Sequence, residues 1–249
     1  MGSITVVICE KSRGIFSLFL WGGAVTMAIG SMFLLMVCSS YIAFFKDNYL
    51  TYTAWIAVSG AILLFLTGTF GLCMIAKDSQ CQQGTFMFLI VVLICIEATS
   101  AVLAAAYTKR VAYELSSLDE KFNHYNGTGT QSDRDVDTLQ HELRCCGVHN
   151  YTDWKSTTWY EYTANNSVPE SCCDRRSINC TGNMTQFEFF YDQGCLTKLE
   201  HRVKLYLTYI LWSSVAVLCL LVLAAMSNGI LMIYSPEQDY TAVSSGTLA

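Results

Sequence analysis

Cysteine is the residue type with the most chemistry to offer in this sequence, which has 12 cysteines among 249 residues. Half of them fall in one polar stretch, where an even number suits three disulfides formed in an oxidising compartment. These are Cys145, Cys146, Cys172, Cys173, Cys180 and Cys195. Adjacent cysteines bridge each other only with strain, so each neighbouring pair should bond to other cysteines. His149 raises the alternative of zinc, but the oxidising setting favours disulfides, and we expect no metal site.

The same stretch holds every N-glycosylation sequon of the chain, an asparagine with serine or threonine two positions later. The five acceptors are Asn126, Asn150, Asn165, Asn179 and Asn183. Asn179 is the least favoured, because its neighbour Cys180 is expected to be bridged early. One or two sequons arise by chance, but five beside six cysteines indicate a lumenal or extracellular segment.

Catalytic patterns are absent from the sequence. It has no His-Glu-x-x-His, no Gly-x-Ser-x-Gly and no phosphate-binding glycine loop, and its four histidines are scattered. The net charge of −5 and the lack of a Lys/Arg cluster argue against nucleic acid as a partner. We therefore expect no enzyme and no small-molecule substrate.

Four long stretches almost free of charge must position these residues: 14–45, 48–76, 79–108 and 205–236. About 20 apolar helical residues cross the hydrocarbon layer of a bilayer, and helices of soluble cores rarely run so long without charge. The first stretch is too long for a signal peptide, and no cleavage pattern follows it. The sequence predicts an all-α integral membrane protein, a four-helix transmembrane bundle with spans 14–41, 53–76, 84–108 and 205–233.

Small residues recur at seven-residue steps in the first two spans, which lets helices approach closely. They are Gly23, Gly30, Ala54, Ala61 and Gly68.

Glu97 is the one charged residue inside the third span, where a charged carboxylate costs several kcal/mol. We expect it to face the bundle in a helix-to-helix hydrogen bond with a hydroxyl such as Thr26 or Ser100. The alternative is a transport or channel-type subunit built on Glu97, although a single carboxyl is too little to line a route.

The segments between the spans are an N-terminus (1–13), a small loop (42–52), an inner loop (77–83), a large loop (109–204) and a tail (234–249). The large loop has 11 of the 15 basic residues, but loops longer than about 60 residues escape the positive-inside rule. Its sequons and cysteines place it outside. Both termini are then cytosolic, in agreement with Lys11 and Arg13 before the first span.

Three apolar stripes predict that the large extracellular loop is mostly helical and stabilised by disulfides. Two of them continue the third span outward and lead into the fourth, and one precedes the cysteine pair. Residues 148–194 lack such periodicity and should depend on disulfides. The stripes are Val111, Leu115, Leu118 and Phe122; Leu196, Leu199, Val203 and Tyr206; and Val136, Leu139 and Leu143.

The remaining cysteines divide by depth. Cys9, Cys73 and Cys81 lie at or near the cytosolic boundary, where reduced thiols can carry palmitate. Cys38, Cys95 and Cys219 lie deeper and are expected to be packing residues.

The motif set resembles the tetraspanin family over the whole chain. The residues that carry the resemblance are Cys145-Cys146-Gly147, Pro169-Glu170-Ser171-Cys172-Cys173 and Gly194-Cys195, supported by Gly71-Leu72-Cys73 with Cys81, Glu97 and Trp21-Gly22. The segment from His149 to Trp154 is most similar to the tetraspanin-three branch.

This resemblance implies that Cys145 bonds Cys195, and that Cys146 bonds either Cys172 or Cys173 while the other bonds Cys180. It also implies palmitoylation of the boundary cysteines and no cofactor, with membrane lipid or sterol as an occupant of an intramembrane cavity near Glu97. The sequence departs from the family at Ser17 and Leu221, where many members carry polar residues. The intramembrane polar set is then reduced to Glu97.

Aromatic residues are dense in the large loop and could form a partner-binding surface or the core of a small domain. The partner-binding candidates are Trp159, Phe187, Phe189, Phe190 and Tyr191. The resemblance implies a membrane organiser that binds other integral membrane proteins laterally and influences their trafficking, with other tetraspanins as candidate partners.

The tail should leave the membrane as an extended segment, because Pro236 interrupts the fourth helix. It would then present Tyr240 and Val243 as a Tyr-x-x-apolar sorting signal. Such a signal predicts residence at the plasma membrane with cycling through endosomes or lysosomes.

Overall fold

The structure is a computed structural model. It describes the backbone of residues 2–41, 44–45, 49–76, 80–163, 166–174, 176–177 and 179–246, and the side chains of these residues except 2–13, 49, 75–76, 80, 162–163 and 234–246. All regular elements among the described residues are helices, as the sequence predicts. The chain divides into a bundle unit (Met1–Phe33, Tyr52–Ala105 and Thr208–Ala249) and a loop unit (Leu34–Thr51 and Ala106–Leu207).

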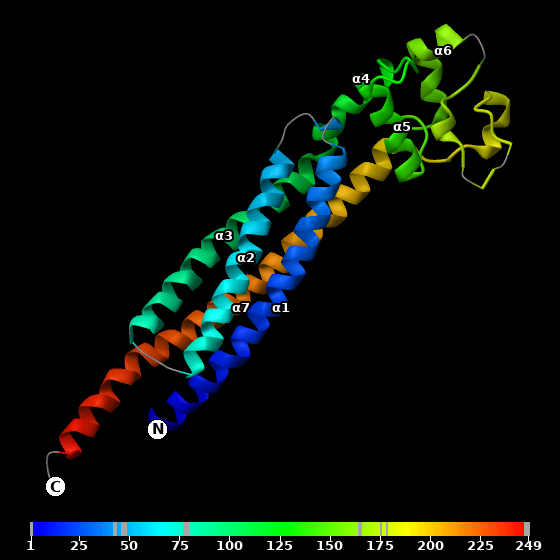
Figure 1. Ribbon diagram of the computed structural model, residues 1–249. Coiled ribbons are helices and arrows are strands. Elements are labelled where there is room, and N and C mark those ends of the chain that lie inside the picture. Colours follow the sequence, from blue (N-terminus) through cyan, green and yellow to red (C-terminus); the bar gives the residue numbers. More distant parts are fainter. Residues whose placement is uncertain are drawn as a thin grey trace. The chain divides into compact units, whose positions relative to one another are not determined.

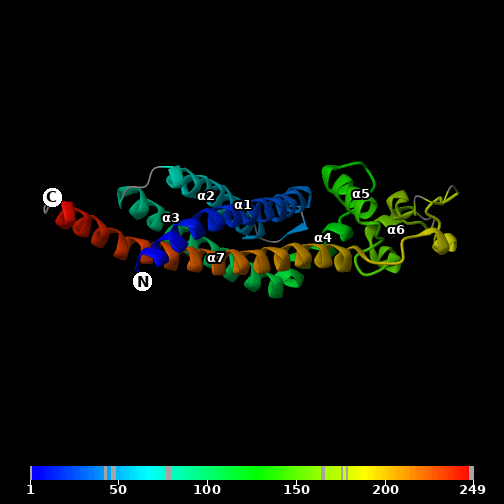
Figure 2. The ribbon, with the colours of Figure 1, turned by 90° about the horizontal axis from the view of Figure 1, so that it is seen from below.

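Four long helices supply the bundle unit: α1 (Gly2–Ser40), α2 (Tyr49–Ala76), α3 (Gln80–Glu114) and α7 (Cys195–Gly246). They run side by side in both views (Figures 1 and 2). All four contain segments long and apolar enough to cross a bilayer: Gly14–Ser40, Leu50–Met74, Cys81–Asn123 and Cys195–Ile233. The prediction of four membrane-spanning helices is confirmed.

The buried side chains of α3 and α7 recur at alternating steps of three and four residues. This is the spacing of knobs-into-holes packing between helices that cross at shallow angles. In α3 they are Gln83, Phe86, Ile90, Leu93, Glu97, Ser100 and Ala104, and in α7 Ile210, Ser214, Val217, Leu221, Ala224, Asn228 and Leu231. Large apolar side chains such as Phe88, Val102 and Trp212 are about two-thirds exposed on the outside, which suits contact with lipid rather than water.

Small residues permit close helix contacts inside the bundle, as their spacing predicts. A Cβ on Gly30 would lie 2.4 Å from the ring of Tyr209, whose hydroxyl donates to the Thr26 carbonyl at 2.9 Å. A Cβ on Gly23 would lie 2.9 Å from Val217, and one on Gly68 2.7 Å from Trp21. A methyl group at any of these positions would force the neighbouring side chain to shift, so the glycines let α1 lie this close to its neighbours.

The loop unit contains the outer parts of α3 and α7 and seven short helices between them. These are η2 (Leu115–Ser117), α4 (Leu118–Asn123), α5 (Gln131–Leu143), η3 (Tyr151–Ser156), α6 (Thr158–Thr163), η4 (Glu170–Cys172) and η5 (Met184–Phe189). The three helices expected from the apolar stripes are present, and most of the stripe residues are buried. Trp154 is fully buried at the centre, 5.4 Å from the ring of Phe122 and 5.1 Å from that of Tyr125.

The tail differs from the sequence prediction. The α7 helix continues through Pro236 to Gly246, so the expectation of an extended segment after Pro236 is wrong. A proline removes one backbone hydrogen bond and bends a helix, but the residues that follow can still pair with earlier carbonyl groups.

Candidate functional site

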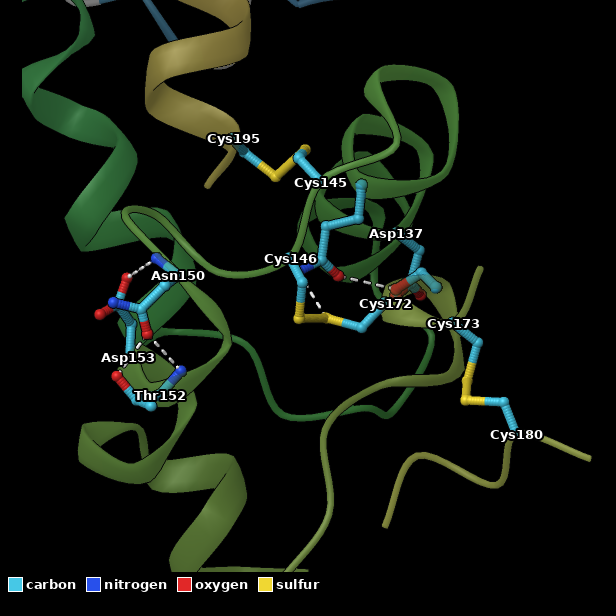
Figure 3. The surroundings of a disulfide bond; sticks show 12 residues. Asp137, Cys145, Cys146, Asn150, Thr152, Asp153, Cys172, Cys173, Cys180 and Cys195 are labelled. Carbon is cyan, nitrogen blue, oxygen red and sulfur yellow. Dashed lines mark hydrogen bonds between the residues drawn. A yellow bond between two sulfur atoms is a disulfide. The ribbon is translucent and has the colours of Figure 1, made fainter. Parts of the chain in front are cut away.

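Three disulfides fasten the loop unit (Figure 3). Cys145 bonds Cys195 and so ties the end of α5 to the first residue of α7. Cys146 bonds Cys172, and the neighbouring Cys173 bonds Cys180. This pairing agrees with the one that the resemblance implies. It also selects Cys172 rather than Cys173 as the partner of Cys146, a choice that the sequence left open.

The glycine after the first cysteine pair is required by its backbone. Gly147 has a φ of +71°, and a Cβ there would lie 1.9 Å from the Asn150 carbonyl oxygen. Its carbonyl accepts the Cys195 N–H at 3.0 Å. A Cβ on Gly194 would lie 2.3 Å from the His149 carbonyl. Gly147 therefore allows the tight turn after the cysteine pair, and Gly194 allows the segment before α7 to touch that turn.

A buried glutamine connects the two cysteine motifs, and no local sequence pattern indicated this role. Gln140 is fully buried, and its amide has the orientation that satisfies both ends. The amide oxygen accepts from the Gly147 N–H at 3.0 Å and from Trp154 Nε1 at 3.3 Å, while the amide nitrogen donates to Ser171 Oγ at 2.8 Å. Ser171 in turn donates to Asp137 at 2.7 Å. Pro169, the motif proline, precedes η4 and accepts the Cys172 N–H at 3.0 Å.

Three of the five sequons have the same local structure. In each, the asparagine Oδ1 accepts the N–H and the hydroxyl of the threonine two positions later, as Figure 3 shows for Asn150 and Thr152. This turn uses the carbonyl end of the amide. The nitrogen, the atom that carries a glycan, makes no hydrogen bond with the described residues in Asn126, Asn150 or Asn183. In the Asn179 sequon, the N–H and hydroxyl of Thr181 instead donate to Gln186 Oε1, and Cys180 is in a disulfide. Asn165 lies outside the described residues.

The aromatic partner-binding candidates divide by exposure. Phe190 and Tyr191 are 4% and 8% exposed, so the structure places them in the core and contradicts a surface role. Phe187 and Phe189 are 52% and 37% exposed on η5, and Trp159 is half-buried on α6. Tyr151, which the sequence analysis missed, stacks on Phe187 with ring centres 6.4 Å apart. We call Tyr151, Phe187 and Phe189 the aromatic patch.

Glu97 is 1% exposed and lies between helices, with Oε1 3.1 Å from the position of a Cβ on Gly60. The expected hydroxyl partners are wrong. Thr26 donates to the Gly23 carbonyl instead, and the Ser100 hydroxyl makes no hydrogen bond with the described residues. Neither carboxyl oxygen of Glu97 has a hydrogen-bond partner among the described residues, and the buried Ser214 hydroxyl of α7 donates to Met27 Sδ at 3.8 Å.

The sequence analysis reduced the set of intramembrane polar residues to Glu97 and so missed a buried polar contact at Asn228. Asn228 of α7 is 2% exposed and donates through Nδ2 to the Gln83 carbonyl of α3 at 3.2 Å. The available signal was the seven-residue step that places Ser214, Leu221 and Asn228 on one buried stripe.

Of the boundary cysteines, Cys73 and Cys81 are exposed, while the Cys9 side chain lies outside the described residues. Cys38 is buried, as a packing residue should be. Cys95 and Cys219 are exposed, so their expected packing role is wrong. Cys95 of α3 and Cys219 of α7 lie outside the buried stripes of their helices.

Comparison with known proteins gives a consistent result. The sequence model of the Tetraspanin family matches residues 12–232. Tetraspanin-36 of Danio rerio is 31% identical over 196 residues, 78% of this chain and 80% of that protein. Tetraspanin-11 of Homo sapiens is 30% identical over 75% of this chain and 76% of its own length. The CD151 antigen of Rattus norvegicus is 28% identical over 81% of both chains.

Proposed function

Because the chain belongs to the tetraspanin family, we propose that it is a non-catalytic membrane organiser that binds and clusters partner membrane proteins and influences their trafficking. It is a multi-pass membrane protein, and family membership supports an organising role in general. The observation that carries the finer proposal is the aromatic patch. Tyr151 and Phe187 stack on each other at the surface of a disulfide-fastened unit, where large aromatic side chains supply much of the binding free energy of protein interfaces.

The surroundings of Glu97 favour the organiser over a transport subunit. The carboxyl is 1% exposed and lies against Gly60 of α2 within the buried stripe of α3, a position that suits packing between helices rather than the lining of an open route.

Replacing Glu97 with glutamine separates the two functions. An organiser should capture the same partner proteins within about twofold, because an amide still fits a buried polar site. In reconstituted vesicles, neither parent nor Glu97→Gln should conduct protons above empty vesicles. A proton flux that disappears in Glu97→Gln would replace the organiser proposal with the transport alternative.

For membrane lipid, the bundle unit offers a groove of about 380 Å³ between α1 and α2. Its lining is apolar and includes Ala28, Ala61 and Phe65. An acyl chain or a sterol would fit such a surface, and we propose this groove rather than the surroundings of Glu97 as the lipid site.

The large loop is proposed to be lumenal or extracellular, with both termini cytosolic. The three disulfides and the three sequon turns support this orientation, since both features belong to the oxidising side of the membrane.

We propose that Cys9, Cys73 and Cys81 are acylated and that acylation supports lateral association. Acyl-exchange labelling of the Cys9→Ser/Cys73→Ser/Cys81→Ser variant should lose most of the signal. Cys95→Ser is the matched control, because Cys95 is also exposed but lies deep within α3. An unchanged signal in the triple variant would exclude these sites.

We also propose that Tyr240 and Val243 act as a sorting signal. Both lie within α7, so an adaptor that binds the segment in extended form must first unwind the last turns of this helix. Uptake of an antibody to the large loop should fall in Tyr240→Ala relative to the parent chain. Equal uptake and equal endosomal fractions would leave a protein of the cell surface.

A further inference from the structure

One cavity of the loop unit has no role in the function proposed above. It measures about 670 Å³, within the range of small-ligand sites, and opens between α5 and the segment that leads into η4. Its lining includes Asp137 and His141 of α5, Glu170 and Ser171 of η4, and Trp159 of α6.

The side chains around this cavity combine hydrogen-bonding groups with one aromatic face. Asp137 is held in place by the hydroxyls of Tyr125, at 3.2 Å, and Ser171, at 2.7 Å. Tyr125 is 5% exposed and packs edge-on against Trp159, with ring centres 5.4 Å apart. Carboxylates accept hydrogen bonds from hydroxyl groups, and an indole face accepts C–H groups. A sugar ring offers both kinds of donor.

The charged side chains that line the cavity indicate which class of sugar it can bind. Among the described residues that line it there are two carboxylates and no lysine or arginine. A sulfated or sialylated sugar would meet like charges without a counter-ion. The chemistry therefore fits a neutral sugar.

Three sequons reach the wall of this one cavity. Gly127, Ser167 and Thr181 line it, and they are the second or third residues of the sequons at Asn126, Asn165 and Asn179. The Asn126 sequon contacts Trp159, since a Cβ on Gly127 would lie 2.0 Å from Cζ3 of the ring. The backbone of this sequon therefore lies against the six-membered ring of the indole.

The Asn126 turn is also fixed in position. Asp133 accepts the N–H of Asn126 at 3.1 Å and the N–H of Thr130 at 3.2 Å. Burial alone would raise the pKa of Asp133, but these hydrogen bonds hold it below its usual value, so the carboxylate remains charged at neutral pH. Asn126 itself is exposed, with its Oδ1 occupied by Thr128.

We propose that this cavity binds the neutral N-acetylglucosamine core of an N-linked glycan, and that the glycan on Asn126 of the same chain supplies it. This rests on the proposed lumenal or extracellular location of the large loop. The glycan would then be part of the folded loop unit rather than a solvated appendage.

Nuclear magnetic resonance on the full-length protein tests the intramolecular arrangement. Glycans are trimmed enzymatically to one isotope-labelled N-acetylglucosamine per site, and Thr128→Ala identifies the signal of the Asn126 sugar by removing that sequon. The ring current of Trp159 should displace this signal from those of the other sugars. Trp159→Ala should abolish the displacement and Phe187→Ala, an exposed aromatic control outside the cavity, should not. A signal that is not displaced, or that ignores Trp159→Ala, overturns the intramolecular arrangement.

Titration with free chitotriose separates the two possible sources of the sugar. The Thr128→Ala protein should bind it, and adding Trp159→Ala should weaken binding at least about tenfold. Since Trp159 also packs on Tyr125, Glu170→Gln is the second variant, and this exposed change should weaken binding severalfold without disturbing the fold. Equal binding by the parent and Thr128→Ala would mean that the cavity takes a glycan from another molecule.

No binding by any form would overturn the cavity assignment. Mass spectrometry of the Asn126 peptide keeps this result distinct from a failure of the proposed orientation. An absence of glycan at every sequon would contradict the orientation, whereas chitotriose would still report on the cavity.

Discussion

Replacing Gly147 with alanine will prevent the loop unit from folding. The added methyl group would lie 1.9 Å from the Asn150 carbonyl oxygen, which is backbone and cannot rotate away as a side chain can. The residue also has a φ of +71°, which is unfavourable for alanine. We expect a loss of at least about 3 kcal/mol, the range of severe single substitutions, because relief of the contact would move the segment that holds the start of α7.

Gly129→Ala is the matched control. Gly129 has a similar φ of +75°, but a Cβ there would meet nothing within 4 Å. It should therefore show the cost of the backbone conformation alone, about 1 kcal/mol. The measurement is the fraction of chains with native disulfides, from non-reducing peptide mapping, together with the amount at the cell surface. Equal results for the two variants would show that the contact with Asn150 is unimportant.

The three disulfides should differ in their contribution in the order of the chain length that each closes. They span separations of 50, 26 and 7 residues. Loop-closure entropy then predicts losses of about 4 kcal/mol for Cys145→Ser/Cys195→Ser, about 3.5 kcal/mol for Cys146→Ser/Cys172→Ser and about 2.4 kcal/mol for Cys173→Ser/Cys180→Ser. Removing cysteines in pairs avoids leaving an unpaired thiol that could form a wrong bridge.

Burial should enlarge the differences in stability loss among the three disulfide variants. Cys145, Cys146, Cys172 and Cys195 are fully buried, whereas Cys173 and Cys180 are partly exposed. Serine at a fully buried position also needs a hydrogen-bond partner. The order is measured by thermal unfolding of the loop unit in the purified full-length protein. The fluorescence of the buried Trp154 reports on this unit. If the loss of Cys173–Cys180 were the most damaging, the role of Cys145–Cys195 in fixing the start of α7 would be wrong.

The features that the sequence predicted are those with a strong periodic or counted signal. Charge-free stretches give the spans, because hydrocarbon excludes charge along a whole helix. Steps of three and four residues give the stripes at Val111, Val136 and Leu199. Glycines at seven-residue steps gave the close contacts at Gly23, Gly30 and Gly68.

The failures concern contacts that depend on three-dimensional packing. Gln140 has no local signature, since its role is to link Gly147, Trp154 and Ser171 across the fold. The aromatic residues from Phe187 to Tyr191 could not be divided into core and surface from the sequence. Residues 187–189, at the end of a short 3₁₀ helix, are exposed and residues 190–191 after it are buried, a division that follows no regular helical or strand period. The surroundings of the Glu97 carboxyl depend on which residues of the neighbouring helices face α3.

The aromatic patch is proposed to contact partner proteins that are anchored in the membrane. A photo-crosslinking amino acid at position 187 in the full-length protein, in intact cells, tests it most directly, with position 155 as control because Lys155 is exposed outside the patch. The account predicts discrete crosslinked species at 187 that contain integral membrane proteins and that are weak or absent at 155. The same crosslinking pattern at both positions, or no protein adduct at 187, would contradict it.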